Sequence, residues 1–77
     1  PDWKKGLSIF DSRTLEFVLN ELKNYYDIKL DVSNIDTTQI YTGSFTHENL
    51  EIALNSITLP LGLSYTINGE TVLLSNK

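Results

Sequence analysis

The chain of 77 residues contains the same pattern twice, and this internal repeat limits its fold more than any other feature. The stretch FDSRTLEFVLNEL begins at Phe10 and FTHENLEIALNSI begins at Phe45, so matching residues lie 35 positions apart. In each copy four apolar residues fall at i, i+3, i+4 and i+7, which places them on one side of a helix. They are Leu15, Val18, Leu19 and Leu22 in the first copy, and Leu50, Ala53, Leu54 and Ile57 in the second. The sequence therefore predicts two matching amphipathic helices.

The residues around each apolar stripe predict where the helices begin and end. A phenylalanine precedes the first leucine of each stripe by five residues, which is the spacing of a hydrophobic staple around the N-cap. Asp11 and Thr46 are therefore the predicted N-caps, each expected to contribute about 1 kcal/mol by accepting a first-turn amide. Pro60 and Gly62 predict the end of the second helix, because proline has no amide hydrogen and restricts the residue before it.

Apolar and polar residues alternate after each helix, which predicts strands with one buried face, and weaker strand signals precede the helices. The four predicted strands cover residues 7–10, 28–32, 40–45 and 63–67. Asn68 and Gly69 predict a two-residue type I′ turn that leads into a final strand over residues 71–74. This register would place Tyr65 opposite Val72.

The predicted fold is α+β and consists of two βαβ units followed by a hairpin strand. The first unit covers residues 7–32 and the second covers residues 40–67, with a polar connector over residues 33–39. One unit cannot bury its apolar stripe alone, so we expect the two units to share one small mixed sheet with both helices on one face. Residues 1–77 then form a single domain, which at this size buries only about 60% of the surface that its unfolded chain exposes.

Charge is distributed unevenly along the chain, and this disfavours anionic partners. The net charge is −4, and no lysine or arginine occurs between Leu30 and Asn76. A phosphate backbone or an anionic membrane surface would be repelled by that half, so no nucleic-acid partner is expected. No apolar run reaches the roughly 20 residues needed to span a bilayer. The chain begins with Pro1 and contains no methionine, so we expect it to be a piece of a longer polypeptide.

The residue types that catalysis and cofactor binding require are scarce. There is no cysteine, and the single histidine, His47, falls at the predicted start of the second helix, where we expect a solvated side chain. Glu51 lies one helical turn after His47, but two such ligands are too few for most metal sites. The stretch closest to a phosphate-binding loop, LPLGL, has one glycine and no lysine. We therefore expect no catalytic residue, no metal and no cofactor, and a protein that is not an enzyme.

Exposed apolar residues are the better candidates for function, because they can mark a surface that binds another protein. Phe17 and Ile52 occupy matching places in the two helices, about 200° from the apolar stripe. A strand over residues 40–45 would present alternate side chains on its outer face, and its open edge could accept a partner strand. Isolated surface residues or coverage by a neighbouring segment are the alternative explanations. The candidate partner-binding residues are Phe17, Ile52, Ile40, Thr42, Ser44 and Trp3.

Several short motifs resemble, in order and spacing, the C-terminal domain of FecR-type anti-sigma regulators in the form common in Bacteroidetes. They are W-K-x-G-L-S-x-F-D from Trp3, T-L-E-x-V-L from Thr14, Y-Y-x-I from Tyr25, T-G-S-F from Thr42, L-E-x-A-L from Leu50 and G-L-S-Y-T-I-N-G from Gly62. The resemblance extends from Trp3 to about Leu74, which is nearly the whole chain. Asp27 departs from the family, which often has glycine there, although aspartate can adopt a left-handed conformation at some cost.

The resemblance implies both a fold and a function. The family's domain is similar to the short N-terminal domain of secretins and TonB-dependent transporters, a twice-repeated βαβ fold that agrees with the internal repeat. It implies a periplasmic domain of a protein anchored in the inner membrane. Such a domain senses the periplasmic signalling domain of an outer-membrane TonB-dependent transporter, while a cytoplasmic region outside this chain holds an extracytoplasmic-function sigma factor. The alternatives are the short N-terminal domain of a transporter or secretin itself, and an unrelated periplasmic adaptor or cell-wall-binding domain.

Overall fold

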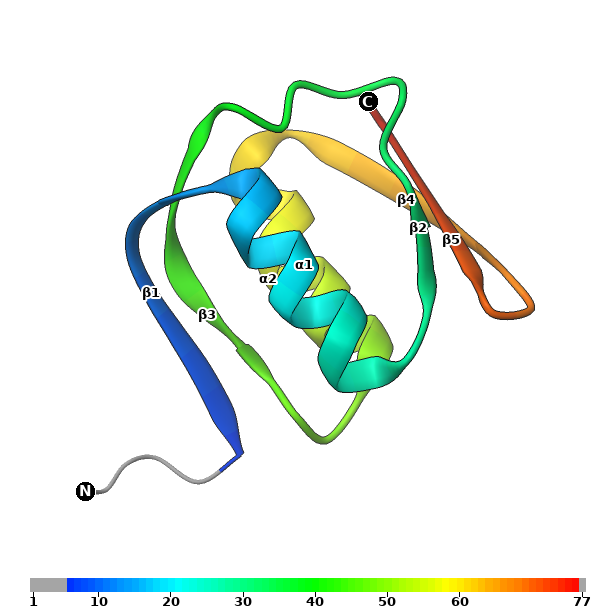
Figure 1. Cartoon of the computed structure of the whole chain (residues 1–77), viewed down its shortest axis with the longest axis horizontal. Helices are drawn as coiled ribbons and strands as arrows, with labels where there is room; N and C mark the ends of the chain where they lie inside the picture. The colour runs from blue at the N-terminus through cyan, green and yellow to red at the C-terminus, as the bar shows by residue number, and fades with distance from the viewer. Residues whose placement is uncertain (1–5, 77) are drawn as a thin grey trace.

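The structure of the chain is a computed structural model that describes residues 6–76, and its elements follow the order expected for two βαβ units and a final strand (Figure 1). The predicted α+β class is confirmed. The first unit contains β1 (Leu7–Thr14), α1 (Leu15–Tyr26) and β2 (Lys29–Asp31). The second contains β3 (Ile40–Thr46), α2 (Leu50–Leu61) and β4 (Leu63–Asn68), and β5 (Thr71–Asn76) follows.

The strands form two sheets, whereas the sequence predicted one. β1 pairs antiparallel with β3, and the second sheet has the order β2-β5-β4, in which β5 runs parallel to β2 and antiparallel to β4. Figure 1 shows β1 and β3 on one side of the helices and the other three strands on the opposite side. Alternation predicts which face of a strand is buried, but it does not determine which strands become neighbours. Both sides of the helix pair are therefore covered, and neither sheet alone forms the predicted layer.

A single core fills the space between the two sheets. The predicted stripes are confirmed except that Leu50 is only partly buried, and α1 and α2 both contribute to the same buried cluster. The sheets contribute Phe10, Tyr41, Phe45, Leu63, Val72 and Leu74. The two repeats thus bury their apolar residues together in one cluster.

The predicted N-caps were wrong by three residues in both copies. Thr14 caps α1 through its hydroxyl, which accepts from the Phe17 amide at 3.2 Å, and Asn49 caps α2 by accepting from the Ile52 amide at 3.0 Å. Phe10 is not a staple residue, because it lies within β1, four residues before the N-cap. Its ring is buried and stacks on the ring of Phe45 at a centroid distance of 5.7 Å. The two true caps are still 35 positions apart, so the repeat itself is kept.

The turn between β4 and β5 also lies one residue later than predicted. Asn68 pairs with Thr71, so the loop consists of Gly69 and Glu70. Gly69 has φ +64 at the first loop position, which is the place that a type II′ turn reserves for glycine. As a result Tyr65 faces Leu74 and not Val72, and β5 extends to Asn76.

Candidate interaction surfaces

Phe17 lies on α1 and is 40% exposed, as its position opposite the stripe predicted. Its ring packs edge-on against Phe10 at a centroid distance of 6.1 Å, and the Arg13 guanidinium lies 4.9 Å from the ring centre. A shallow hollow of about 350 Å³ next to it is lined by Phe17, Arg13 and four other residues of β1 and α1. The contribution of β1 was not predicted, because the bulge between Phe10 and Arg13 that brings Arg13 over the ring has no clear sequence signal.

Ile52 lies on α2 and is 56% exposed. Leu59 follows it by seven residues on the same side of the helix and is 65% exposed, and Asn55 lies exposed between them. We call Ile52, Asn55 and Leu59 the α2 face. Leu59 is missing from the predicted set, although counting two further turns from Ile52 would have identified it.

The outer face of β3 carries the predicted alternation. Ile40 is 55% exposed and Thr42 is exposed, whereas Tyr41 and Phe45 are buried on the inner face. Ser44 is half-buried. Among the strands of residues 6–76, β1 and β3 each pair with a single neighbour, so each keeps one edge without a strand partner. Thr42 is already engaged, because its hydroxyl accepts from the amide of Ser12 at 2.9 Å in the β1 bulge.

His47 is not the solvated residue that the sequence predicted. It is half-buried, lies before α2, and its ring stacks on Tyr25 at a centroid distance of 4.1 Å. Its Nε2 atom lies 2.7 Å from the Ser8 hydroxyl, and its amide donates to the carbonyl of Gly6. These contacts tie the loop before α2 to the beginning of β1, which is a structural role.

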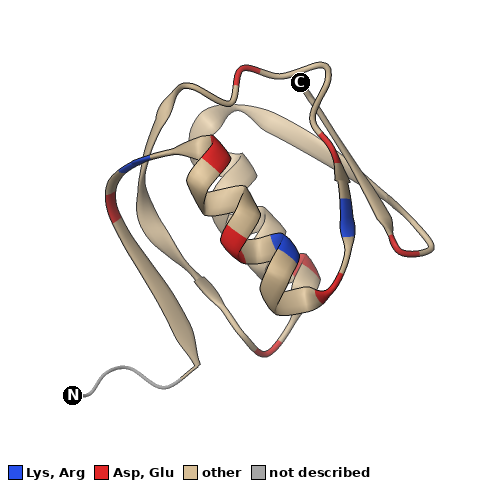
Figure 2. Cartoon of the chain, viewed as in Figure 1, with Lys and Arg blue, Asp and Glu red and all other residues tan. Residues whose placement is uncertain are grey.

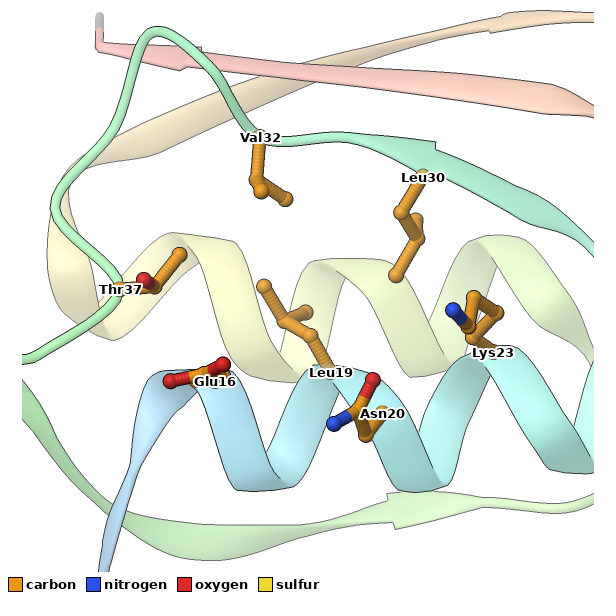
Figure 3. Close-up of a pocket in the computed structure, with 7 residues that line it drawn as sticks. All are labelled: Glu16, Leu19, Asn20, Lys23, Leu30, Val32 and Thr37. Atoms are coloured by element: carbon orange, nitrogen blue, oxygen red, sulfur yellow. The ribbon is translucent and has the colours of Figure 1, made fainter.

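A pocket of about 160 Å³ lies between α1 and the segment that contains β2 (Figure 3). Leu19, Leu30 and Val32 form its apolar floor, and polar side chains stand at its rim, among them Glu16 and Lys23. A cavity of about 150 Å³ holds a molecule the size of benzene, so this pocket has room for one side chain of a partner. It was not predicted, because its walls come from three segments that are separate in the sequence.

Residues 6–76 offer neither a metal-binding cluster nor a membrane-spanning helix. Within them, no three His, Asp or Glu side chains gather in a way that could hold a metal ion. No helix in the described part of the chain has the length and apolar character needed to cross a bilayer. Trp3, the remaining predicted candidate, lies outside the described residues.

The arrangement defines a class of protein: a small duplicated βαβ domain with exposed apolar side chains on several outer faces. Residues 8–74 match the family model described as FecR, C-terminal, and the chain belongs to this family. The resemblance drawn from the sequence motifs is thereby confirmed.

Solved structures share the fold. Two crystal structures of a candidate anti-sigma factor from Parabacteroides distasonis ATCC 8503, at 1.65 and 2.50 Å resolution, superpose with TM-scores of 0.77 and 0.78 at 21% sequence identity. The similarity covers 95% of this chain but 35% of those chains, so this chain spans about a third of their length. A search of curated protein sequences finds no significant match.

Proposed function

We propose that this chain is the periplasmic protein-interaction domain of a FecR-like anti-sigma regulator. In this proposal it recognises the periplasmic signalling domain of an outer-membrane TonB-dependent transporter. The recognition would control an extracytoplasmic-function sigma factor, which is held by a cytoplasmic region of the parent protein in the inner membrane. Membership of the FecR C-terminal family over residues 8–74 is the observation that carries the proposal.

The surface of the domain supports a binding role. Phe17, Ile40, Ile52 and Leu59 are each at least 40% exposed, and they are distributed over both helices and β3. Exposed apolar side chains that lie together can mark a surface that another protein covers, and Ile52 and Leu59 lie on the same side of α2. The similarity to a larger candidate anti-sigma factor, of which this fold occupies about a third, is consistent with a domain that works as part of a longer protein.

The main alternative is the short N-terminal domain of a transporter or secretin. The match to the C-terminal domain of FecR favours the regulator. Gene context separates the two, because a membrane span encoded upstream and a neighbouring sigma-factor gene are expected for a regulator. A plug and barrel encoded downstream would instead indicate a transporter.

A pull-down with purified proteins tests the proposal. The 77-residue chain is immobilised and mixed with the transporter signalling domain encoded beside it, and the signalling domain of an unrelated transporter serves as the control. We expect retention of the neighbouring domain and not of the control. If neither is retained while circular dichroism shows that all three proteins are folded, the proposed function is wrong.

A further inference from the structure

The outer face of α2 differs from that of α1, although the two helices occupy matching places in the repeat. Leu59 stands where α1 has Asn24, and Ser56 stands where α1 has Glu21. Glu51 is the only charged residue within α2, whereas α1 contains three. The apolar stripes and the capping positions are kept in both copies, and Ile52 matches the exposed Phe17 of α1, so Leu59 is the outer position at which α2 alone carries an apolar side chain.

The α2 face continues onto the neighbouring sheet. A hollow of about 200 Å³ beside Leu59 and Asn55 is also lined by Leu63 and Tyr65 of β4. Ile52 lies two helical turns before Leu59, about 10 Å along the axis. Figure 1 shows α1 in front of α2. The face is long enough to accept a segment with several side chains in a row.

The charges near the α2 face indicate the chemistry of its partner. Glu51 lies in the first turn of α2 and Glu48 lies two residues before the helix, and no lysine or arginine occurs between Leu30 and Asn76. Figure 2 accordingly shows no basic residue on α2, β3, β4 or β5. A basic segment would be attracted to this side, whereas a second copy of the chain, with its net charge of −4, would be repelled.

We infer that the α2 face is the docking surface for a partner segment that presents aliphatic side chains flanked by lysine or arginine. The inference rests on the proposed function, in which the transporter signalling domain supplies that segment. Aliphatic side chains of the partner would cover Ile52 and Leu59, and its basic side chains would lie near Glu48 and Glu51. Charges at the rim of an interface mainly change the association rate and its salt dependence, whereas buried apolar contacts mainly set the dissociation rate.

Binding measurements with matched variants test the inference. Ile52→Asn and Leu59→Asn are compared with Ile9→Asn, because Ile9 lies on β1 and its exposed fraction of 64% is close to the 56% of Ile52 and the 65% of Leu59. Surface plasmon resonance measures the rates against the neighbouring signalling domain at two salt concentrations, and thermal melting confirms that each variant is folded. We expect each α2 variant to weaken binding by about tenfold or more through faster dissociation. The β1 variant should bind as the unchanged chain does.

Charge is tested separately with Glu48→Gln combined with Glu51→Gln. This variant should associate more slowly at low salt and lose most of its salt dependence. If the α2 variants bind as the unchanged chain does, or if Ile9→Asn weakens binding as much as they do, the inference is wrong and the proposed function stands. If the unchanged chain does not bind the signalling domain at all, both are wrong. If sedimentation shows a dimer that Leu59→Asn dissociates, the occupant is a second copy, and the inference is again overturned.

Discussion

The buried hydroxyl of Tyr41 links β3 to a weak point in α2. Pro60 lies inside α2 and has no amide hydrogen, so the carbonyl of Ser56 cannot receive the helical hydrogen bond that it would normally accept from position 60. The Tyr41 hydroxyl donates to this carbonyl at 2.9 Å, and the side chain is only 3% exposed. Tyr41→Phe would therefore leave the carbonyl of Ser56, a half-buried residue, without this donor.

The expected cost follows from this geometry. A buried acceptor that loses its partner costs about 1–3 kcal/mol, and a domain of this size has a free energy of unfolding of about 4–12 kcal/mol. With a urea slope of about 1 kcal/mol/M, the midpoint of unfolding should fall by about 1–3 M. Urea titrations followed by far-ultraviolet circular dichroism measure the change. The variant should keep the fold, because only one oxygen atom is removed.

Pro60→Ala provides the decisive control. It restores an amide that can donate to the Ser56 carbonyl, so Tyr41→Phe should cost at least about 1 kcal/mol less in this background than in the unchanged chain. Two results would refute the reasoning: a cost below about 0.5 kcal/mol for Tyr41→Phe alone, or an equal cost in both backgrounds. The second would mean that the hydroxyl stabilises the domain in some way other than by satisfying this carbonyl.

Three further outcomes can be measured in the same protein. Gly43→Ala should destabilise the domain by about 1–3 kcal/mol in urea titrations, because an added Cβ would lie only 2.5 Å from the Tyr41 hydroxyl; unchanged stability would contradict the packing. Burial raises the pKa of Tyr26 and of Tyr41 above 10.0, so the neutral phenols stabilise the folded state below about pH 10, and this stabilisation should be lost as the pH rises through the raised values. Denaturation from pH 8 to 11 measures the loss, which should be smaller in Tyr26→Phe. Hydrogen bonds from the hydroxyl and amide of Thr38 lower the pKa of Asp36 below 3.8. The ionised Asp36 therefore stabilises the folded state above pH 3.8, and this contribution is lost as the pH falls through the lowered pKa. NMR titration of the carboxylate measures the pKa of Asp36. In Thr38→Ala this pKa should return only partly to its ordinary value, because the backbone amide of residue 38 still donates.

The periodicity of the sequence was sufficient to predict the helices and strands, but not which strands pair with each other. The two helical stripes, the strand after each helix and the final strand follow from residue spacing, because burial on one face imposes that spacing directly. The N-caps at Thr14 and Asn49 were missed, since a phenylalanine within a strand and a phenylalanine in a staple can both precede the first leucine of the stripe by five residues. The two separate sheets were missed because pairing is decided by contacts far apart in the sequence. The turn was predicted one residue too early, because glycine fits both the second position of a type I′ turn and the first position of a type II′ turn.

The same distinction applies to the candidate surfaces. The exposure of Phe17 and Ile52 could be predicted, because a residue opposite an apolar stripe must face outward in any helix that packs on one side. The stacking of His47 on Tyr25 and the pocket beside Leu30 could not, because each joins segments whose contact depends on the tertiary fold. Sequence spacing therefore identifies single exposed residues, and the structure is needed to group them into surfaces.

Comparison of the two copies shows which positions are fixed by folding and which are free to differ. Helix caps, apolar stripes and left-handed C-caps recur 35 positions apart, with Asp27 at φ 55 matching Gly62 at φ 70, so these positions are fixed by folding in both copies. Outer positions such as 24 and 59 carry unrelated residues, Asn24 and Leu59, and folding leaves them free to differ. The presence of leucine on one copy and not on the other agrees with the inference that a partner contacts α2. The α2 face is therefore where a partner is expected to distinguish the second repeat from the first.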